Sequence, residues 1–187
     1  MIGNDIIDLG LAKEVSGLRQ SRLYHKLFTP EEQQALKKAE DRNLLFWKFW
    51  AMKEAAYKAH QRRFRLARSF EPTKFECTSS VGEELVKIGE HTYSLHTSRT
   101  AKHLQSVAVA FPAEKFQHET SVTSEETKEK LFAAVSAWKK IPQEKISLEK
   151  DKDSVPHLMY QNRNLNCAFS LSHHGNFSAY VLSLTNC

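Results

Sequence analysis

Residues 50–58 constrain this chain of 187 residues more than any other segment. On a helix, one sector of the segment carries an indole, two ammonium groups and a carboxylate, those of Trp50, Lys53, Lys58 and Glu54. The opposite sector is apolar, with Leu45, Phe49, Met52, Ala56 and Ala59. The pattern predicts a helix whose polar face points in a fixed direction. That face is either an ordinary surface pair of Glu54 and Lys58, worth about 0.2–0.5 kcal/mol, or a functional constellation.

The first part of the chain predicts helices followed by a sheet. Thr29 and Glu32 form a capping-box pattern, and Asp41 or Asn43 can cap the helix that follows. Alternation of apolar and polar residues predicts strands further on. The expected elements are a strand over 2–9, a helix over about 30–40, a helix over about 42–60 and an antiparallel meander over 73–111.

A polar stretch, 118–127, is the best candidate for a linker. We therefore expect two units, 1–117 and 118–187, that form one functional whole. The second unit also predicts a helix before its strands, because Thr123 and Glu126 form a capping pattern. Its expected elements are a helix over about 124–140, a charged stretch over 144–152, a strand over 168–173 and an apolar strand over 177–184.

The charge of the chain favours an acidic partner. Lys and Arg number 27 against 22 for Asp and Glu, so the net charge is +5 and the sequence pI is about 9.1. A nucleotide, an acidic protein and a nucleic acid all fit. The N-terminus lacks a secretion signal, and no stretch approaches the roughly 18 apolar residues of a membrane span. Three cysteines without metal-like spacing fit reduced thiols, so we expect a cytoplasmic protein without a membrane partner.

Asp5 is the first acidic residue of interest, because a carboxylate on an apolar strand is costly to bury unless it is paired or bound to a metal. Gly3 leaves room for a backbone or a ligand to approach. An aspartate that caps a turn at the end of a strand is the alternative. If strand and helix pack together, Glu54 could supply a second carboxylate, and two carboxylates with phosphate oxygens and water form a typical Mg²⁺ site.

Ser172 and His173 follow one another near the C-terminal end of a predicted strand. Both side chains could donate hydrogen bonds to an anion. They do not form a convincing nucleophile pair, because adjacent residues of a strand point to opposite faces. Polar residues at a surface turn remain the alternative.

Four motifs in this order resemble the 4′-phosphopantetheinyl transferase superfamily. They cover most of the chain, and each is weak alone. The motifs are Gly3-x-Asp5, Phe28-Thr29-x-x-Glu32, Trp50-x-x-Lys53-Glu54-Ala55-x-x-Lys58 and Ser170-x-Ser172-His173. The resemblance implies an α+β fold of two similar lobes, each with an antiparallel sheet packed on helices, which together form a pseudo-dimer.

The resemblance also implies the activity of a holo-acyl-carrier-protein synthase. Such an enzyme moves the phosphopantetheine arm of coenzyme A to a serine of an apo carrier protein and releases adenosine 3′,5′-bisphosphate. Asp5 and Glu54 match the ligands of Mg²⁺, and Lys58 matches the lysine that stabilises charge on the phosphates. Lys53, Ser172 and His173 match contacts to coenzyme A. Glu54, or a water on the metal, is the implied base.

The chain departs from the family in three places. Ile7 stands where many larger members have a further acidic residue. Ser154-Val155-Pro156 replaces a Gly-Lys-Pro motif, and Lys152 could substitute for the missing lysine. Arginines replace a glycine-rich stretch after the motif helix. The arginines could dock a carrier protein or form a solvated basic face, and they are Arg62, Arg63, Arg65 and Arg68.

The order of the motifs suggests a circular permutation. In the larger members the half with the Ser-His motif comes first, whereas here it comes last. We therefore expect a monomer whose site lies between two lobes of one chain. Two alternatives stay open: a non-catalytic module that binds coenzyme A or a carrier protein, and a nucleic-acid binder. The second is suggested only by the arginines and the net charge, and a recognised motif is missing.

Overall fold

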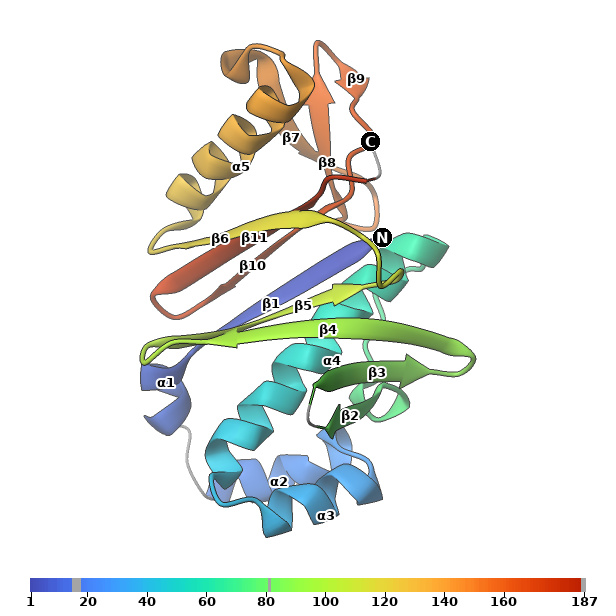
Figure 1. Ribbon diagram of the computed structural model, residues 1–187, viewed down its shortest axis with the longest axis vertical. Helices are drawn as coiled ribbons and strands as arrows, with labels where there is room; N and C mark the ends of the chain where they lie inside the picture. Colours follow the sequence, from blue (N-terminus) through green and yellow to red (C-terminus); the bar gives the residue numbers. More distant parts are fainter. Residues whose placement is uncertain (15–17, 81, 186–187) are drawn as a thin grey trace.

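The first lobe of the computed structural model, which describes residues 1–14, 18–80 and 82–185, is a five-stranded antiparallel sheet with helices (Figure 1). The strand order is β1-β5-β4-β3-β2. We use first lobe for the elements from β1 to β5. They are β1 (Ile2–Asp8), α1 (Leu9–Glu14), α2 (Leu18–Leu27), α3 (Pro30–Lys38), α4 (Arg42–Phe64), a 3-10 turn (Pro72–Lys74), β2 (Glu76–Ser80), β3 (Glu83–Ile88), β4 (His91–Arg99) and β5 (His103–Val109).

The second lobe, from β6 to β11, contains two three-stranded antiparallel sheets, with strand orders β10-β11-β6 and β7-β8-β9. Helix α5 packs on the first of these sheets. The elements are β6 (Phe116–Ser121), α5 (Ser124–Lys139), a 3-10 turn (Gln143–Lys145), β7 (Ile146–Lys150), β8 (Pro156–Tyr160), β9 (Arg163–Asn164), β10 (Phe169–His174) and β11 (Phe177–Ser183). Both lobes therefore combine antiparallel sheets with helices, and the α+β prediction is confirmed.

The predicted helix starts are confirmed in detail. Thr29 and Glu32 form the capping box of α3, and the side chain of Asp41 accepts a hydrogen bond from Leu44 N at the start of α4. Thr123 caps α5 in the same way. Helix α4 ends at Phe64, four residues later than expected, and α1 and α2 were not predicted.

The linker predicted over 118–127 is wrong. Residues Phe116–Ser121 form β6, which pairs with β11, and α5 begins at Ser124. β6 is polar because it lies at the edge of its sheet and most of its side chains are exposed or half-buried. The predicted boundary after residue 117 falls inside this strand.

A close approach of β1 to α4 fixes the centre of the molecule. Gly3 lies against the helix backbone, where an added Cβ would overlap Ala55 O and lie 2.7 Å from Ala59 N. Because strand side chains alternate, Gly3, Asp5 and Ile7 face α4, while their neighbours face the second lobe. The β1 residue Ile2 joins Val107, Val109 and Val181 in an apolar cluster between the lobes.

A polar clasp joins the lobes at the other end of β1. The backbone N–H of Asp8 donates to His174 Nδ1 at 2.9 Å, and the Asp8 carboxylate accepts from Asn176 N at 3.0 Å. Burial alone would raise the pKa of Asp8, but hydrogen bonds from Asn176, Gly10 and Leu11 hold it below its usual value. The turn reaches Asp8 because Gly175, with φ of +55°, has no Cβ to overlap the Asp8 side chain. The clasp sets the position of β10.

Two remaining expectations concern cysteines and membranes. Cys77 is a free thiol, whereas Cys167 is disulfide-bonded, which corrects the expectation of reduced thiols at that position. Cys187 lies outside the described residues. Among the helices in the described part of the chain, none is long and apolar enough to cross a membrane.

We predict that Gly3→Ala will lower the free energy of unfolding by at least about 1–3 kcal/mol, because the new methyl group must push β1 away from the backbone of α4. Urea denaturation measures the change. Gly10→Ala is the control, since its Cβ would meet only the Asp8 side chain, at 3.1 Å. Equal stabilities of the two variants would contradict the proposed role of this contact.

Candidate active site

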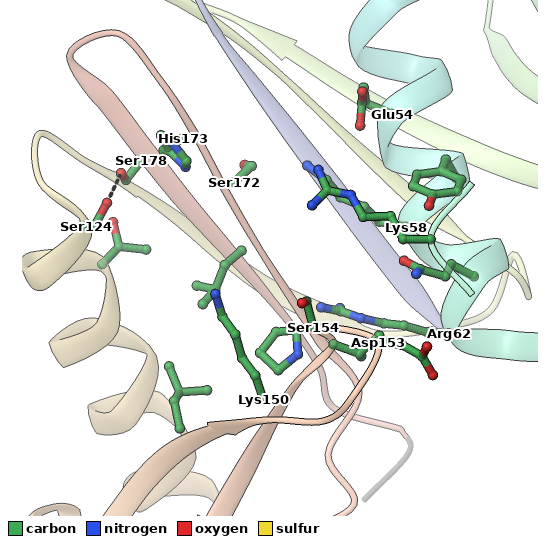
Figure 2. A pocket seen from close by; sticks show the side chains of 18 of the residues that line it. Glu54, Lys58, Arg62, Ser124, Lys150, Asp153, Ser154, Ser172, His173 and Ser178 are labelled. Atoms are coloured by element: carbon green, nitrogen blue, oxygen red, sulfur yellow. Dashed lines mark hydrogen bonds between the residues drawn. The ribbon is translucent and has the colours of Figure 1, made fainter. Parts of the chain in front are cut away.

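A cavity of about 620 Å³ lies between the lobes, and both lobes contribute side chains to its wall. Glu54, Lys58 and Arg62 come from α4, at the i, i+4 spacing that places side chains on one helix face. Figure 2 shows these three side chains opposite residues of the second lobe. The opposite wall includes Ser124, Lys128, Lys150, Ser154, Ser172 and His173. The structure thus brings together the two predicted segments that lie more than 100 residues apart.

Lys58 connects the cavity to β1. Its Nζ donates to Asp5 Oδ1 at 2.9 Å and to Asn4 O at 3.0 Å. Asp5 is buried behind Lys58 and does not itself line the cavity. Burial raises the pKa of the Asp5 carboxyl, and the ammonium group of Lys58 opposes that shift.

Glu54 is the more strongly perturbed acid. Burial, with the nearby charge of Asp5, raises the pKa of its carboxyl to about 7, against the opposing charges of Lys58 and Arg68. Within the described ranges, no donor lies within hydrogen-bond distance of this carboxylate. A carboxylate with a negative neighbour and without hydrogen bonds is a favourable place for a cation or a proton.

Ser172 and His173 enter the cavity from β10. The Ser172 hydroxyl is buried, and no group of the described residues hydrogen-bonds to it. His173 is exposed at the rim. Both side chains are therefore available to a ligand, although they were predicted to point to opposite faces of the strand.

The comparison with known families gives a decisive match. The family described as the 4′-phosphopantetheinyl transferase superfamily matches residues 1–112, which is more than half of the chain. The chain belongs to the 4′-phosphopantetheinyl transferase superfamily. A search of curated proteins finds no match. Membership identifies a transferase of the phosphopantetheinyl kind, with coenzyme A as the substrate and typically a divalent metal.

The matched region includes Asp5, Glu54 and Lys58 but ends before β6. Ser172 and His173 therefore lie outside it, and it is the packing of the second lobe that brings them to the same cavity. For a 4′-phosphopantetheinyl transferase, this places polar groups of the unmatched lobe beside the matched motifs.

The two acids fit a divalent cation of the kind that the superfamily typically uses. Mg²⁺ is commonly held by one or two carboxylates, with substrate phosphates and water completing its coordination. Asp5 approaches from β1 and Glu54 from α4, close enough for the charge of one to raise the pKa of the other. The described residues contain no group of three or more His, Cys, Asp or Glu side chains that could hold a metal ion by themselves. A cation here would depend on the phosphates of the substrate.

Lys53 does not reach the cavity, which corrects the prediction that it contacts coenzyme A. Its Nζ is fully buried and pairs with Glu32 Oε2 at 2.7 Å, while donating to Pro72 O at 2.9 Å. The other Glu32 oxygen accepts from Cys77 N at 2.7 Å. Lys53 lies at the edge of the predicted polar sector. Its pairing with Glu32 directs the side chain into the core, where α3, α4 and β2 meet.

Three cations of the cavity were missed or assigned otherwise. Lys150 lines it, whereas Lys152, the predicted substitute for the missing lysine, lines a neighbouring cavity. Arg62 and Arg68 line the cavity, although they were predicted either to dock a carrier protein or to form a solvated basic face. The spacing of Glu54, Lys58 and Arg62 was the signal that could have identified Arg62.

We predict that Lys53→Met will lower the free energy of unfolding by about 3–5 kcal/mol, because the Glu32 carboxylate stays buried without its cation. Coenzyme A affinity of the folded variant should stay unchanged, as measured by calorimetry at low temperature. Lys48→Met, which removes the partly exposed pair between this α4 residue and Glu84 of β3, should cost less than Lys53→Met. A loss of coenzyme A affinity in folded Lys53→Met would contradict a purely structural role.

We also predict that the metal-free protein loses stability as the pH rises from about 5 to about 8. The pKa of Glu54 is about 7 in the folded protein, against an ordinary 4.5, so the folded state binds more protons in this range. The loss should be on the order of 3 kcal/mol and absent in Glu54→Gln. Urea unfolding in the presence of a chelator measures it, and parallel pH profiles of the two proteins would contradict the prediction.

Proposed function

We propose that the protein transfers the 4′-phosphopantetheine group of coenzyme A to a serine of an apo acyl or peptidyl carrier protein and releases adenosine 3′,5′-bisphosphate. Membership of the superfamily supports phosphopantetheinyl transfer in general. The observation that carries the specific proposal is the pair of Asp5 and Glu54 beside Lys58, in a cavity with walls from both lobes.

We assign the metal to Asp5 and Glu54. Mg²⁺, when bound there, would neutralise the pyrophosphate and polarise the phosphorus under attack. Lys58 lines the cavity and pairs with Asp5 behind it, so its ammonium group can move from Asp5 to the phosphates once a cation compensates Asp5. Ser172 and His173 offer a hydroxyl and an imidazole to the nucleotide.

Glu54 is also the proposed base. The pKa of about 7 belongs to the protein without a cation, and a bound Mg²⁺ would lower it. We therefore assign Glu54 as the base on its position in the cavity beside Asp5 and Lys58. The hydroxyl proton of the carrier serine passes to Glu54, and the serine oxygen bonds to the phosphorus that carries the pantetheine. The bond from that phosphorus to the oxygen of the adenosine 5′-phosphate breaks, and the electron pair leaves with adenosine 3′,5′-bisphosphate.

The partners follow from the same arrangement. The net charge of +5 favours an acidic carrier protein. Because one chain supplies both walls of the cavity, we propose a monomer in which the two lobes form a pseudo-dimer. We propose neither a nucleic acid nor a membrane as a partner. Such an enzyme would work in the cytoplasm, where coenzyme A and carrier proteins meet.

The test is to incubate the protein with coenzyme A, Mg²⁺ and several apo carrier proteins, and to follow carrier mass. We predict a gain of one phosphopantetheine group, which needs Mg²⁺. Glu54→Gln should lower the rate at least about 100-fold, because both the base and a metal ligand are lost. Glu90→Gln, at an exposed turn between β3 and β4, is the matched control and should keep full activity.

Two results would overturn parts of this proposal. Coenzyme A binding without transfer to any carrier would favour the non-catalytic binding module. Full activity of Glu54→Gln would exclude Glu54 as the base and as a required metal ligand.

A further inference from the structure

Arg62 lines two neighbouring cavities of the protein. It lines the active-site cavity and also a second cavity of about 560 Å³, which lies toward the end of α4. Figure 2 shows its side chain extending from α4 toward Ser154 and Asp153 of the second lobe. Arg62 is therefore a cation of the first lobe that reaches the wall formed by the second.

The guanidinium group of Arg62 is poorly compensated. Its Nη1 is buried, and among the described residues it has no hydrogen-bond partner. The group lies over the ring of Phe169, 5.4 Å from the ring centre, which orients the guanidinium plane without using its N–H groups. Burial lowers the pKa of Arg62 to about 10, and only the charge of Asp151 opposes this. Buried N–H groups of a cation without an acceptor indicate a place for an anion.

The nearest acid is already engaged. The Asp151 carboxylate pairs with His157 Nε2 at 3.0 Å and accepts from Val155 N and Asp153 N, at 2.9 Å each. These contacts hold the turn that precedes β8. No carboxylate of the described residues lies within ion-pair distance of Arg62. An internal salt bridge therefore does not explain the arginine.

The position of Arg62 on α4 indicates which phosphate of the substrate it contacts. Arg62 lies four positions after Lys58, so the two side chains leave α4 about 6 Å apart along the helix axis. Lys58, with Asp5 and Glu54, is assigned to the pyrophosphate. The remaining anionic group of coenzyme A is the phosphate on its ribose, and Arg62 faces the segment Ser154-Val155-Pro156, which carries no lysine.

We propose that Arg62 binds the ribose 3′-phosphate of coenzyme A from the first lobe, and so makes the enzyme selective for nucleotides that carry this group. The inference rests on the proposed function for the identity of the ligand. Lys150, from β7 of the opposite wall, lines the same cavity and can contact the same phosphate. A phosphate held between α4 and β7 would tie the lobes together when the substrate binds.

Calorimetric titration with adenosine 3′,5′-bisphosphate and with AMP tests this assignment. The wild-type protein should bind the bisphosphate at least about tenfold more tightly than AMP. In Arg62→Gln that preference should fall to about twofold, with AMP affinity nearly unchanged. Arg62→Lys, which keeps the charge and the stem, should retain part of the preference. Arg63→Gln is the matched control, because Arg63 lies over Phe64 and Phe111, lines neither cavity and should keep the full preference.

The outcomes separate this inference from the proposed function. Equal weakening of both nucleotides in the Arg62 variants would mean that Arg62 only braces the lobes, and it would overturn the assignment. An unchanged preference in the variants, or none in the wild type, would also overturn it. A preference that depends on Arg62, in a protein that transfers nothing to any carrier, would support the assignment while the proposed function fails.

Discussion

The contact between β1 and α4 at Gly3 is the constraint on which the candidate site depends. The strand approaches the helix so closely that a Cβ at residue 3 would overlap the carbonyl oxygen of Ala55. Because side chains alternate along a strand, the same packing turns Asp5 toward Lys58 and Glu54. The other face of β1 contacts the second lobe, where the clasp at Asp8 positions β10. One strand thus aligns both walls of the cavity.

The charged side chains of the cavity are not fully compensated by one another. Asp5 is paired with Lys58. Glu54 lies partly buried beside them without a hydrogen bond from any described residue, and its pKa is about 7. One helical turn beyond Lys58 on α4, Arg62 is a half-buried cation whose Nη1 is buried without a hydrogen-bond partner among the described residues. A magnesium ion and a nucleotide that carries phosphates at both places would satisfy the acids and the arginine together. Folding alone leaves Glu54 and Arg62 without a partner for their charge among the described residues.

Local signals in the sequence predicted most of the elements but not all of the contacts. The caps at Thr29, Asp41 and Thr123 are confirmed, because a cap depends on residues three positions apart. The predicted role of Lys53 was wrong. Its partner Glu32 belongs to another helix, and helix spacing alone cannot reveal such a pairing. The β6 strand was taken for a linker because an edge strand can be polar on both faces. The helix spacing places Arg62 on the same face as Lys58, but no local pattern could show that this face meets the second lobe.

The central claim is that both lobes of one chain close around coenzyme A, with the metal on β1 and α4. A crystal structure of the protein with coenzyme A and Mg²⁺ tests it most directly. The account predicts the nucleotide in the cavity between the lobes, and one Mg²⁺ at about 2.0–2.1 Å from oxygens of both Asp5 and Glu54. A nucleotide bound outside this cavity, or a metal held by neither carboxylate, would contradict it.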